Sequence, residues 1–297
     1  MELSLTSEQI QKLKKGLEQC ILKSTSTERT SSLVLTASGR EYVGAVIGSD
    51  TNLMHISSEH SALALSISAN DFPVREVVTM IESEQDFLLS PVVVKVMVDY
   101  TSRSQAPLSY RVVDKEGKTL FQSENVEDIF PLYNPAPISI SRTKEPYSPN
   151  KVKEEISPDD MPKELKKFAL MGMGRNFPLY DSASSYGTAV YTSTGHVYFA
   201  GQYSSPDKRL NLHSEMTAMI SAILDEGGKI ESIGVVSNKY PDSPCNMCGS
   251  CRQFVSEMSA KLNISPDLYL FSSESSEFKK IKIEEYLPDS WSSKKWI

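Results

Sequence analysis

The sequence has few cysteines, no excess of basic residues and no long apolar run. The 297-residue chain has four cysteines, and its net charge is −7, so it has no surplus of basic residues. No apolar run approaches the roughly 20 residues of a membrane-spanning helix. We therefore expect that the chain neither spans a membrane nor has a membrane as its partner. The negative charge argues against adhesion to nucleic acid. The N-terminus lacks the basic-then-apolar layout of a secretion signal, and we therefore expect a cytoplasmic location.

The cysteines are unevenly distributed. Cys20 stands alone, whereas Cys245, Cys248 and Cys251 lie within seven residues. A secreted disulfide framework would spread its cysteines along the chain. The cluster therefore predicts a metal site.

The chain repeats itself at an offset near 156 residues. Residues 33–45 and 189–201 share one layout, a strand, a Gly turn and a second strand. Identical residues stand at three matched positions: Thr36 and Thr192, Gly39 and Gly195, Tyr42 and Tyr198. This similarity is the first sign of an internal duplication.

Three further matches follow in the same order. Ser58–Glu59 falls on Ser214–Glu215; Ser90–Pro91 on Ser243–Pro244, at an offset of 153; and residues 126–131 on 283–288. Such an ordered series indicates two tandem copies of one unit. Each copy alternates helices and strands, which predicts an α/β fold with a central sheet between helices, a three-layer α-β-α unit.

The domain boundaries follow from composition. Residues 134–156 are rich in proline and polar residues, which favours a linker. We therefore place the first copy at residues 1–133 and the second at 157–297.

The second copy contains candidates for metal chemistry. His213 and Glu215 open a helical segment, and Pro244 is expected to start another helix that carries all three clustered cysteines. The positive ends of helices favour thiolate, the form that binds zinc. One histidine and two cysteines leave the fourth tetrahedral position of zinc for water, as in catalytic sites. A carboxylate two residues past the histidine can then move protons.

These motifs, H-x-E followed by P-C-x-x-C, are those of zinc nucleobase deaminases. The sequence resembles the zinc-dependent cytidine deaminases, and more narrowly the long two-domain type of bacteria and plants. The residues that carry the resemblance are 197–199, 213–215, 248–254 and 286–291.

The resemblance implies a zinc cofactor and hydrolytic deamination of cytidine or deoxycytidine in pyrimidine salvage, with release of ammonia. It implies that Glu215 protonates N3 of cytosine and later passes a proton to the departing amino group. It also places Trp291 near the base, often in a neighbouring subunit's site, which suggests a homodimer.

The cysteine spacing departs from the family. The Arg-Gln-Phe sequence after Cys251 favours Cys248 with Cys251 as ligands, whereas Pro244 favours Cys245 with Cys248. If all three cysteines bound zinc with His213, the site would be closed and purely structural.

The ribose-binding pattern is also altered. The family has Asn-x-Glu after the second strand, and this chain has Gln202 and Ser204 as the candidate substrate-binding residues. Glutamine can replace asparagine as a hydrogen-bonding group, but serine cannot replace a carboxylate. A modified nucleoside or single-stranded nucleic acid as substrate, and a zinc-stabilised pseudoenzyme, therefore stay alternatives.

The first copy is expected to be degenerate. By the repeat, Ser57 occupies the histidine position, and Val92, Lys95 and Val98 occupy the cysteine positions. Only Glu59 persists, and a carboxylate without a metal has no hydroxide to generate. We predict a non-catalytic partner domain.

Overall fold

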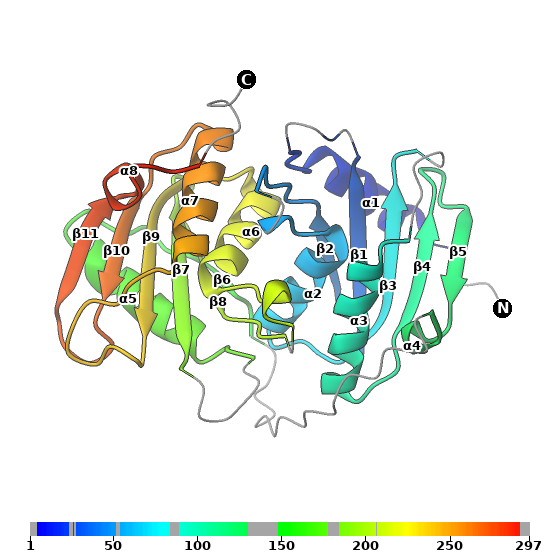
Figure 1. Ribbon diagram of the computed structural model, residues 1–297, viewed down its shortest axis with the longest axis horizontal. Coiled ribbons are helices and arrows are strands. Elements are labelled where there is room, and N and C mark those ends of the chain that lie inside the picture. Colours follow the sequence, from blue (N-terminus) through cyan, green and yellow to red (C-terminus); the bar gives the residue numbers. More distant parts are fainter. Residues whose placement is uncertain are drawn as a thin grey trace. The chain divides into compact units, whose positions relative to one another are not determined.

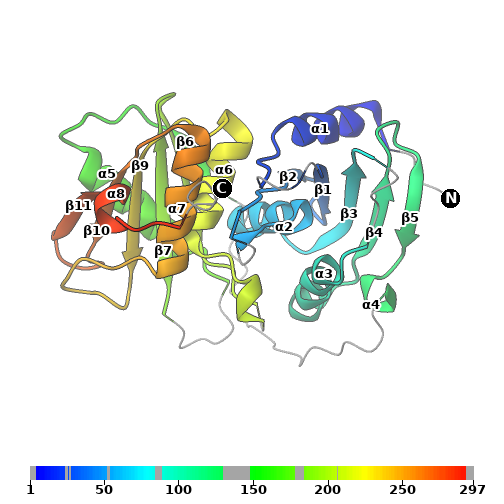
Figure 2. The ribbon, with the colours of Figure 1, turned by 45° about the horizontal axis from the view of Figure 1, so that its top comes forward.

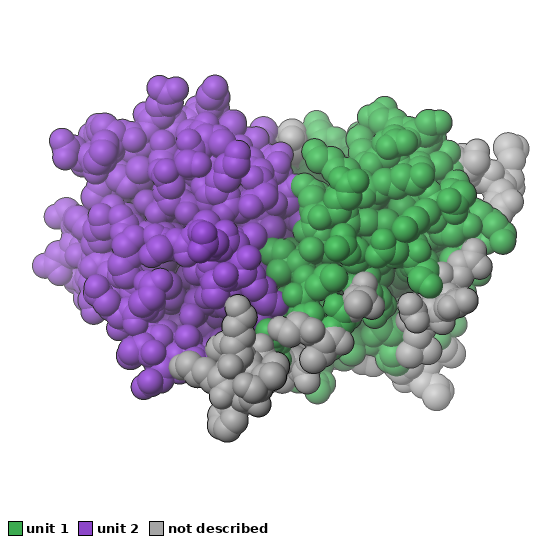
Figure 3. Space-filling view, turned by 90° about the horizontal axis from the view of Figure 1, so that it is seen from above, with its two compact units in different colours: residues 1–146, 205–210 green, residues 147–204, 211–297 purple. Residues whose placement is uncertain are grey.

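The computed structural model of the chain describes residues 5–23, 26, 28–51, 54–83, 89–129, 148–177, 184–205 and 207–291. The chain forms two compact units. The first comprises Met1–Pro146 and Ser205–Leu210, and the second Tyr147–Ser204 and Asn211–Ile297 (Figure 3). Among the described residues, no helix has the length and apolarity needed to cross a bilayer.

The first unit has a five-stranded sheet in the order β2-β1-β3-β4-β5. Its elements are α1 (Ser7–Glu18), β1 (Thr30–Thr36), β2 (Glu41–Ala45), α2 (Ser58–Ser68), β3 (Val74–Ile81), α3 (Pro91–Ser104), β4 (Ser109–Val113), β5 (Thr119–Ser123) and α4 (Val126–Ile129). Thr6 caps α1 in a capping box with Gln9.

The second unit has a six-stranded sheet in the order β11-β10-β9-β7-β8-β6. Its elements are β6 (Lys151–Lys153), α5 (Met161–Met173), β7 (Tyr186–Thr192), β8 (His196–Gly201), α6 (Ser214–Glu226), β9 (Ile230–Ser237), α7 (Gly249–Leu262), β10 (Asp267–Phe271), β11 (Phe278–Lys282) and α8 (Ile283–Tyr286) (Figure 1). The 3-10 turn Lys208–Leu210 belongs to the first unit.

Helices cover both faces of the second sheet, as the alternation along β7 shows. A Cβ on Gly187 would lie 2.0 Å from the Ala169 carbonyl oxygen of α5, so this residue faces α5. The Thr188 hydroxyl instead lies 2.8 Å from that of Ser214 in α6. Successive side chains of a strand point to opposite faces, so α5 and α6 cover opposite sides. Figure 2 shows the same layering, and the predicted three-layer α/β fold is confirmed.

The first sheet is covered in the same way. A Cβ on Gly16 of α1 would collide with the Ser31 side chain, whereas the hydroxyl of Ser32 lies 2.7 Å from that of Ser58 in α2. Leu13 and Leu17 of α1 form a core with Leu33 and strand residues of β3 and β4.

Detailed geometry repeats between the units. Strands β1 and β7 each carry a register shift at their last residue, Thr36 and Thr192. The isolated bridges Ile21–Ile47 and Ile47–Ile56 recur, 156 residues on, as Phe177–Tyr203 and Tyr203–Leu212. These features confirm the duplication that the sequence indicates.

One part of the repeat alignment is wrong. Helices α3 and α7 begin at Pro91 and Gly249, which are 158 residues apart, not 153. The Ser-Pro pair that suggested the smaller offset starts a helix only in the first unit. In the second unit, Pro244 precedes an irregular segment whose Cys245 N–H donates to the carbonyl of Phe271.

Three strands at sheet edges were not expected. Strand β6 lies inside the predicted linker 134–156 and pairs antiparallel with β8, while residues 134–147 of that linker lie outside the described residues. Strands β5 and β11 each extend their sheet by one antiparallel strand. In β11, Lys280 and Lys282 both pair with Asp267 at 2.8 Å.

Candidate metal centre

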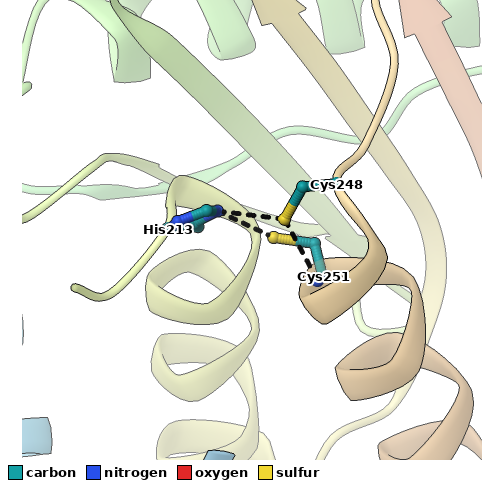
Figure 4. A group of neighbouring side chains, drawn as sticks. All are labelled: His213, Cys248 and Cys251. Carbon is teal, nitrogen blue, oxygen red and sulfur yellow. Dashed lines mark hydrogen bonds between the residues drawn. The ribbon is translucent and has the colours of Figure 1, made fainter. Parts of the chain in front are cut away.

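His213 stands at the beginning of α6, as predicted. Its backbone is extended, and as N-cap it accepts the first helical hydrogen bond, from the Thr217 N–H, on its carbonyl. The ring does not cap the helix but lies toward α7, where Nδ1 faces two sulfur atoms (Figure 4).

The two sulfur atoms belong to Cys248 and Cys251. The predicted helix from Pro244 is wrong, because α7 begins at Gly249 with Cys248 as its N-cap. The sulfur of Cys248 accepts the Cys251 N–H at 3.5 Å and thereby takes the place of the usual capping oxygen. Both thiols are thus held at the positive end of this helix.

The three side chains converge on one point. His213 Nδ1 lies 3.4 Å from Cys248 Sγ and 3.2 Å from Cys251 Sγ. All three ligand atoms lie within 4.8 Å of one another. One imidazole nitrogen and two thiol sulfurs are a donor set that suits zinc.

The electrostatics of Cys248 favour thiolate. A hydrogen bond from the Cys251 side chain, opposed by burial and aided by His213, lowers the pKa of Cys248 to about 3. Burial lowers the pKa of His213, but the hydrogen bond with Cys248 and the negative charges of Glu215 and Cys248 together outweigh it, so the pKa is raised. A deprotonated thiol is the form that binds a metal.

Cys245 lies apart from this group. Its thiol donates to the Val235 carbonyl of β9 at 3.2 Å, and the side chain is 1% exposed. Burial raises the pKa of Cys245 to about 12, which favours the neutral thiol. The structure therefore brings Cys248 and Cys251 together with His213 and directs the third clustered cysteine to the sheet.

Glu215 is buried in the first turn of α6, with 2% of its surface exposed. It accepts a hydrogen bond from the Ser214 hydroxyl at 3.1 Å, and Ser214 in turn contacts Thr188. Burial is the main cause that raises its pKa, and the neighbouring His213 opposes it. A carboxyl group in such surroundings can hold and release a proton nearer neutral pH than an exposed one.

Gln202 and Ser204 flank Tyr203, whose backbone forms a short bridge with the segment that precedes His213. Tyr203, between them, exchanges two backbone hydrogen bonds with Leu212, the residue before His213, at 2.8 and 3.0 Å. The Gln202 amide donates to the Ser204 hydroxyl at 2.9 Å. The two predicted substrate-binding residues are thus joined to each other and to the segment that carries the histidine.

Trp291 is fixed through its backbone. The Gln253 side chain accepts the Trp291 N–H at 3.0 Å and donates to its carbonyl at 2.9 Å. Gln253 lies two residues past Cys251 on α7, and the Trp291 side chain is 42% exposed. The Trp291 side chain is therefore exposed, while its backbone is held at α7.

Sequence reasoning missed the residues that hold the cysteine segment. The Tyr286 hydroxyl accepts the Met247 N–H at 3.0 Å, and Arg252 Nε donates to the Met247 carbonyl at 3.0 Å. The guanidinium of Arg252 also stacks 3.9 Å above the Tyr286 ring. Both residues belong to the family-like stretches, but only the fold shows that they hold the residue before Cys248.

Asn176 was likewise missed. Its side-chain oxygen accepts the backbone N–H of Gln202 at 3.1 Å, and its amide donates to the Tyr186 carbonyl at 2.9 Å. A lone asparagine after a helix gives no signal in the sequence that it joins two distant segments.

The corresponding place in the first unit is degenerate, as predicted, but by other residues. Ser57 is the N-cap residue of α2 where His213 is that of α6, but only the Ser57 side chain accepts a capping hydrogen bond. By the 158-residue offset, Ser90 and Val93 stand where Cys248 and Cys251 stand, which corrects the assignment to Val92, Lys95 and Val98. The correction arises because α3 begins at Pro91, whereas α7 begins at Gly249, five residues after Pro244.

Comparisons with known proteins give structural likenesses only. The sequence matches no family model and no curated protein. Similar solved structures include the cytidine deaminase from Burkholderia pseudomallei, with 22% identity and a TM-score of 0.39 over 43% of this chain and 98% of that one. The cytidine deaminase from Mycobacterium tuberculosis has 18% identity and a TM-score of 0.35 over 44% and 96%. That from Mycobacterium leprae has 16% identity and a TM-score of 0.34 over 43% and 97%.

Proposed function

We propose that this protein is a zinc-dependent deaminase that hydrolyses the amino group of cytidine or deoxycytidine. The observation that carries the proposal is the convergence of His213 Nδ1 with the sulfurs of Cys248 and Cys251, beside the buried Glu215. The resemblance of the H-x-E and Cys-Arg-Gln-Phe sequences to those of cytidine deaminases supports the same reaction. A homodimer, a cytoplasmic location and a role in pyrimidine salvage stay predictions.

His213, Cys248 and Cys251 are the residues that would hold the zinc ion. When bound, zinc supplies a Lewis acid that lowers the pKa of a coordinated water to roughly 7. The separate position of Cys245, whose thiol is engaged by Val235, supports a set of three protein ligands with a fourth position open to water. This counts against the closed structural site.

Glu215 would move the protons of the reaction. Its carboxylate would take a proton from the attacking water and donate it to N3 of the pyrimidine. Once the water oxygen has bonded to C4, Glu215 would move the proton of this new hydroxyl to the amino group, so that the C4 carbonyl forms, the C4–N bond breaks and ammonia leaves. The hydrogen bond from the Ser214 hydroxyl, at 3.1 Å, would keep the carboxyl oriented at the start of α6.

Gln202 and Ser204 would contact the sugar. The 2.9 Å hydrogen bond between them makes one amide–hydroxyl pair, which can donate and accept hydrogen bonds but has no negative charge. This feature favours a second candidate substrate, a nucleoside with a modified sugar or base. Trp291 would contribute an aromatic face to the base.

The test is turnover by zinc-loaded protein. We expect uridine and ammonia in equal amounts from cytidine, at a rate about 10³-fold lower in the Glu215→Gln variant. A panel with modified cytidines and a cytosine-containing single-stranded oligonucleotide distinguishes the alternatives. Turnover of the oligonucleotide alone would replace the nucleoside proposal, and no turnover at full zinc occupancy would favour a pseudoenzyme.

A further inference from the structure

The 205–210 segment connects two parts of the candidate site yet belongs to the first unit. The chain leaves the second unit after Ser204 and returns at Asn211. The predicted substrate-binding residues directly precede this segment, and His213 follows it by three residues. Motion of the segment would therefore displace both the substrate-binding residues before it and His213 after it.

The beginning of the segment is bound by a buried charge. The Ser205 hydroxyl donates to Asp99 Oδ2 at 2.9 Å, and the two residues are 1% and 0% exposed. Lys95 pairs with the same carboxylate at 2.9 Å. A buried carboxylate requires such partners, so the hydroxyl and the ammonium hold it in one place.

The middle and the end of the segment have anchors of their own. Lys95 also lies 3.8 Å from a carboxylate oxygen of Asp207. The buried ring of His60 hydrogen-bonds the backbone of Leu210. Contacts thus extend from the first to the last residue of the segment.

The anchors lie on the helices that correspond to those of the metal centre. His60 is in the first turn of α2, the counterpart of α6, while Lys95 and Asp99 are on α3, the counterpart of α7. Lys95 and Gln253 are each the fifth residue of their helix, and Gln253 holds the backbone of Trp291. The same helix position therefore binds a segment outside its own helix in both units.

We propose that the first unit is a clamp for the 205–210 segment, with Asp99 as a positioning residue for the substrate-binding residues and the zinc ligand at its two ends. The proposal rests on the proposed function of the metal centre. Fixing the segment in advance removes an ordering cost from substrate binding, and misplacement of either end would weaken the site.

Trypsin provides a test that does not depend on activity. Lys208 and Arg209 are exposed, so cleavage after them reports release of the segment. We expect Asp99→Asn and Ser205→Ala to raise the cleavage rate about tenfold, because the first removes the charge of the buried acceptor and the second removes the donor. Asp71→Asn is the matched control, since this buried carboxylate of the first unit binds Thr36 and Tyr42 instead.

Kinetics test the positioning itself. In zinc-loaded protein we expect Asp99→Asn and Ser205→Ala to raise KM for cytidine more than they lower kcat, with faster zinc release, while Asp71→Asn changes none of these. If Asp99→Asn unfolds the first unit, the milder Ser205→Ala variant tests the positioning role by itself.

The two proposals fail in different ways. Cleavage rates in Ser205→Ala within about twofold of the control would overturn the clamp. Faster cleavage with unchanged KM and zinc release would overturn the positioning role. Absence of turnover in the zinc-loaded wild type would instead count against the proposed function. The rates of trypsin cleavage and of zinc release in the variants would then still test whether the first unit holds the segment.

Discussion

Glu59 and Glu215 stand at the same position in the two units, in the first turn of α2 and of α6. Both are buried, and both accept a hydrogen bond from the preceding serine. Their other neighbours differ. Glu59 also accepts hydrogen bonds from the hydroxyls of Thr79 at 2.8 Å and Tyr110 at 3.0 Å.

The second unit has no hydroxyl at those two strand positions. Val235 corresponds to Thr79 and Leu268 to Tyr110, because Val77–Tyr110 and Ile233–Leu268 are equivalent pairs in the two sheets. Glu215 instead lies beside a histidine and two cysteines. A buried carboxylate is costly unless it is satisfied. The first unit satisfies it with hydroxyls, whereas the second keeps it near groups suited to a metal ion.

The sharpest test of this difference exchanges the carboxylates for amides. Glu215→Gln should lower kcat by about 10³-fold, since general acid–base catalysis contributes roughly 10²–10⁴. Glu59→Gln should leave kcat within about twofold, because its hydroxyl partners are structural. Steady-state kinetics at matched zinc content measures kcat for both variants. An equal loss of kcat in the two would show that the buried glutamates of the two units do not differ in role.

Metal content gives the next largest effect. Replacement of Cys248 by serine, or treatment with a chelator, should reduce bound zinc from about one ion per chain to a small fraction of that. Cys245→Ser should retain it, since its thiol donates to Val235. Elemental analysis measures the ratio. If Cys245→Ser loses zinc while circular dichroism shows an intact fold, Cys245 is also a ligand and the closed site with three cysteines is correct.

Loosening the cysteine segment should have an intermediate effect. Tyr286→Phe removes the acceptor for the Met247 N–H, and we expect zinc to dissociate about tenfold faster, as for other residues that orient ligands. Tyr198→Phe is the control, because its hydroxyl donates to Asp225. Competition with a chromogenic chelator gives both rates, and equal rates would contradict the role of Tyr286.

The smallest effect is on stability. Tyr110→Phe leaves Glu59 with one hydroxyl donor fewer, which should lower the free energy of unfolding by about 1–3 kcal/mol. Tyr42→Phe, at a half-buried hydroxyl that donates to Asp71, should cost less. Urea denaturation compares them, and a larger loss in the control would refute the idea that hydroxyls stabilise the buried Glu59.

Local sequence patterns were sufficient for several features. The Gly turns of both hairpins and the duplication depend on neighbouring residues or on repeated spacing, and the structure confirms both. The position of His213 as N-cap of α6 has the same origin. Such features follow from backbone conformation and capping, which a short window of sequence encodes.

Which cysteines face His213 was decided only by tertiary structure. Cys245, Cys248 and Cys251 have the same chemistry and spacing, and Pro244 suggested a helix that is not there. The Cys245 N–H pairs with Phe271 of β10, and its thiol donates to Val235 of β9, so contact with two distant strands draws this cysteine away and delays the helix to Gly249. The donor types and the duplicated α/β unit follow from residue identity and repeat spacing alone. Long-range hydrogen bonds selected which donors meet, because their partners lie on strands that come together only when the sheet forms.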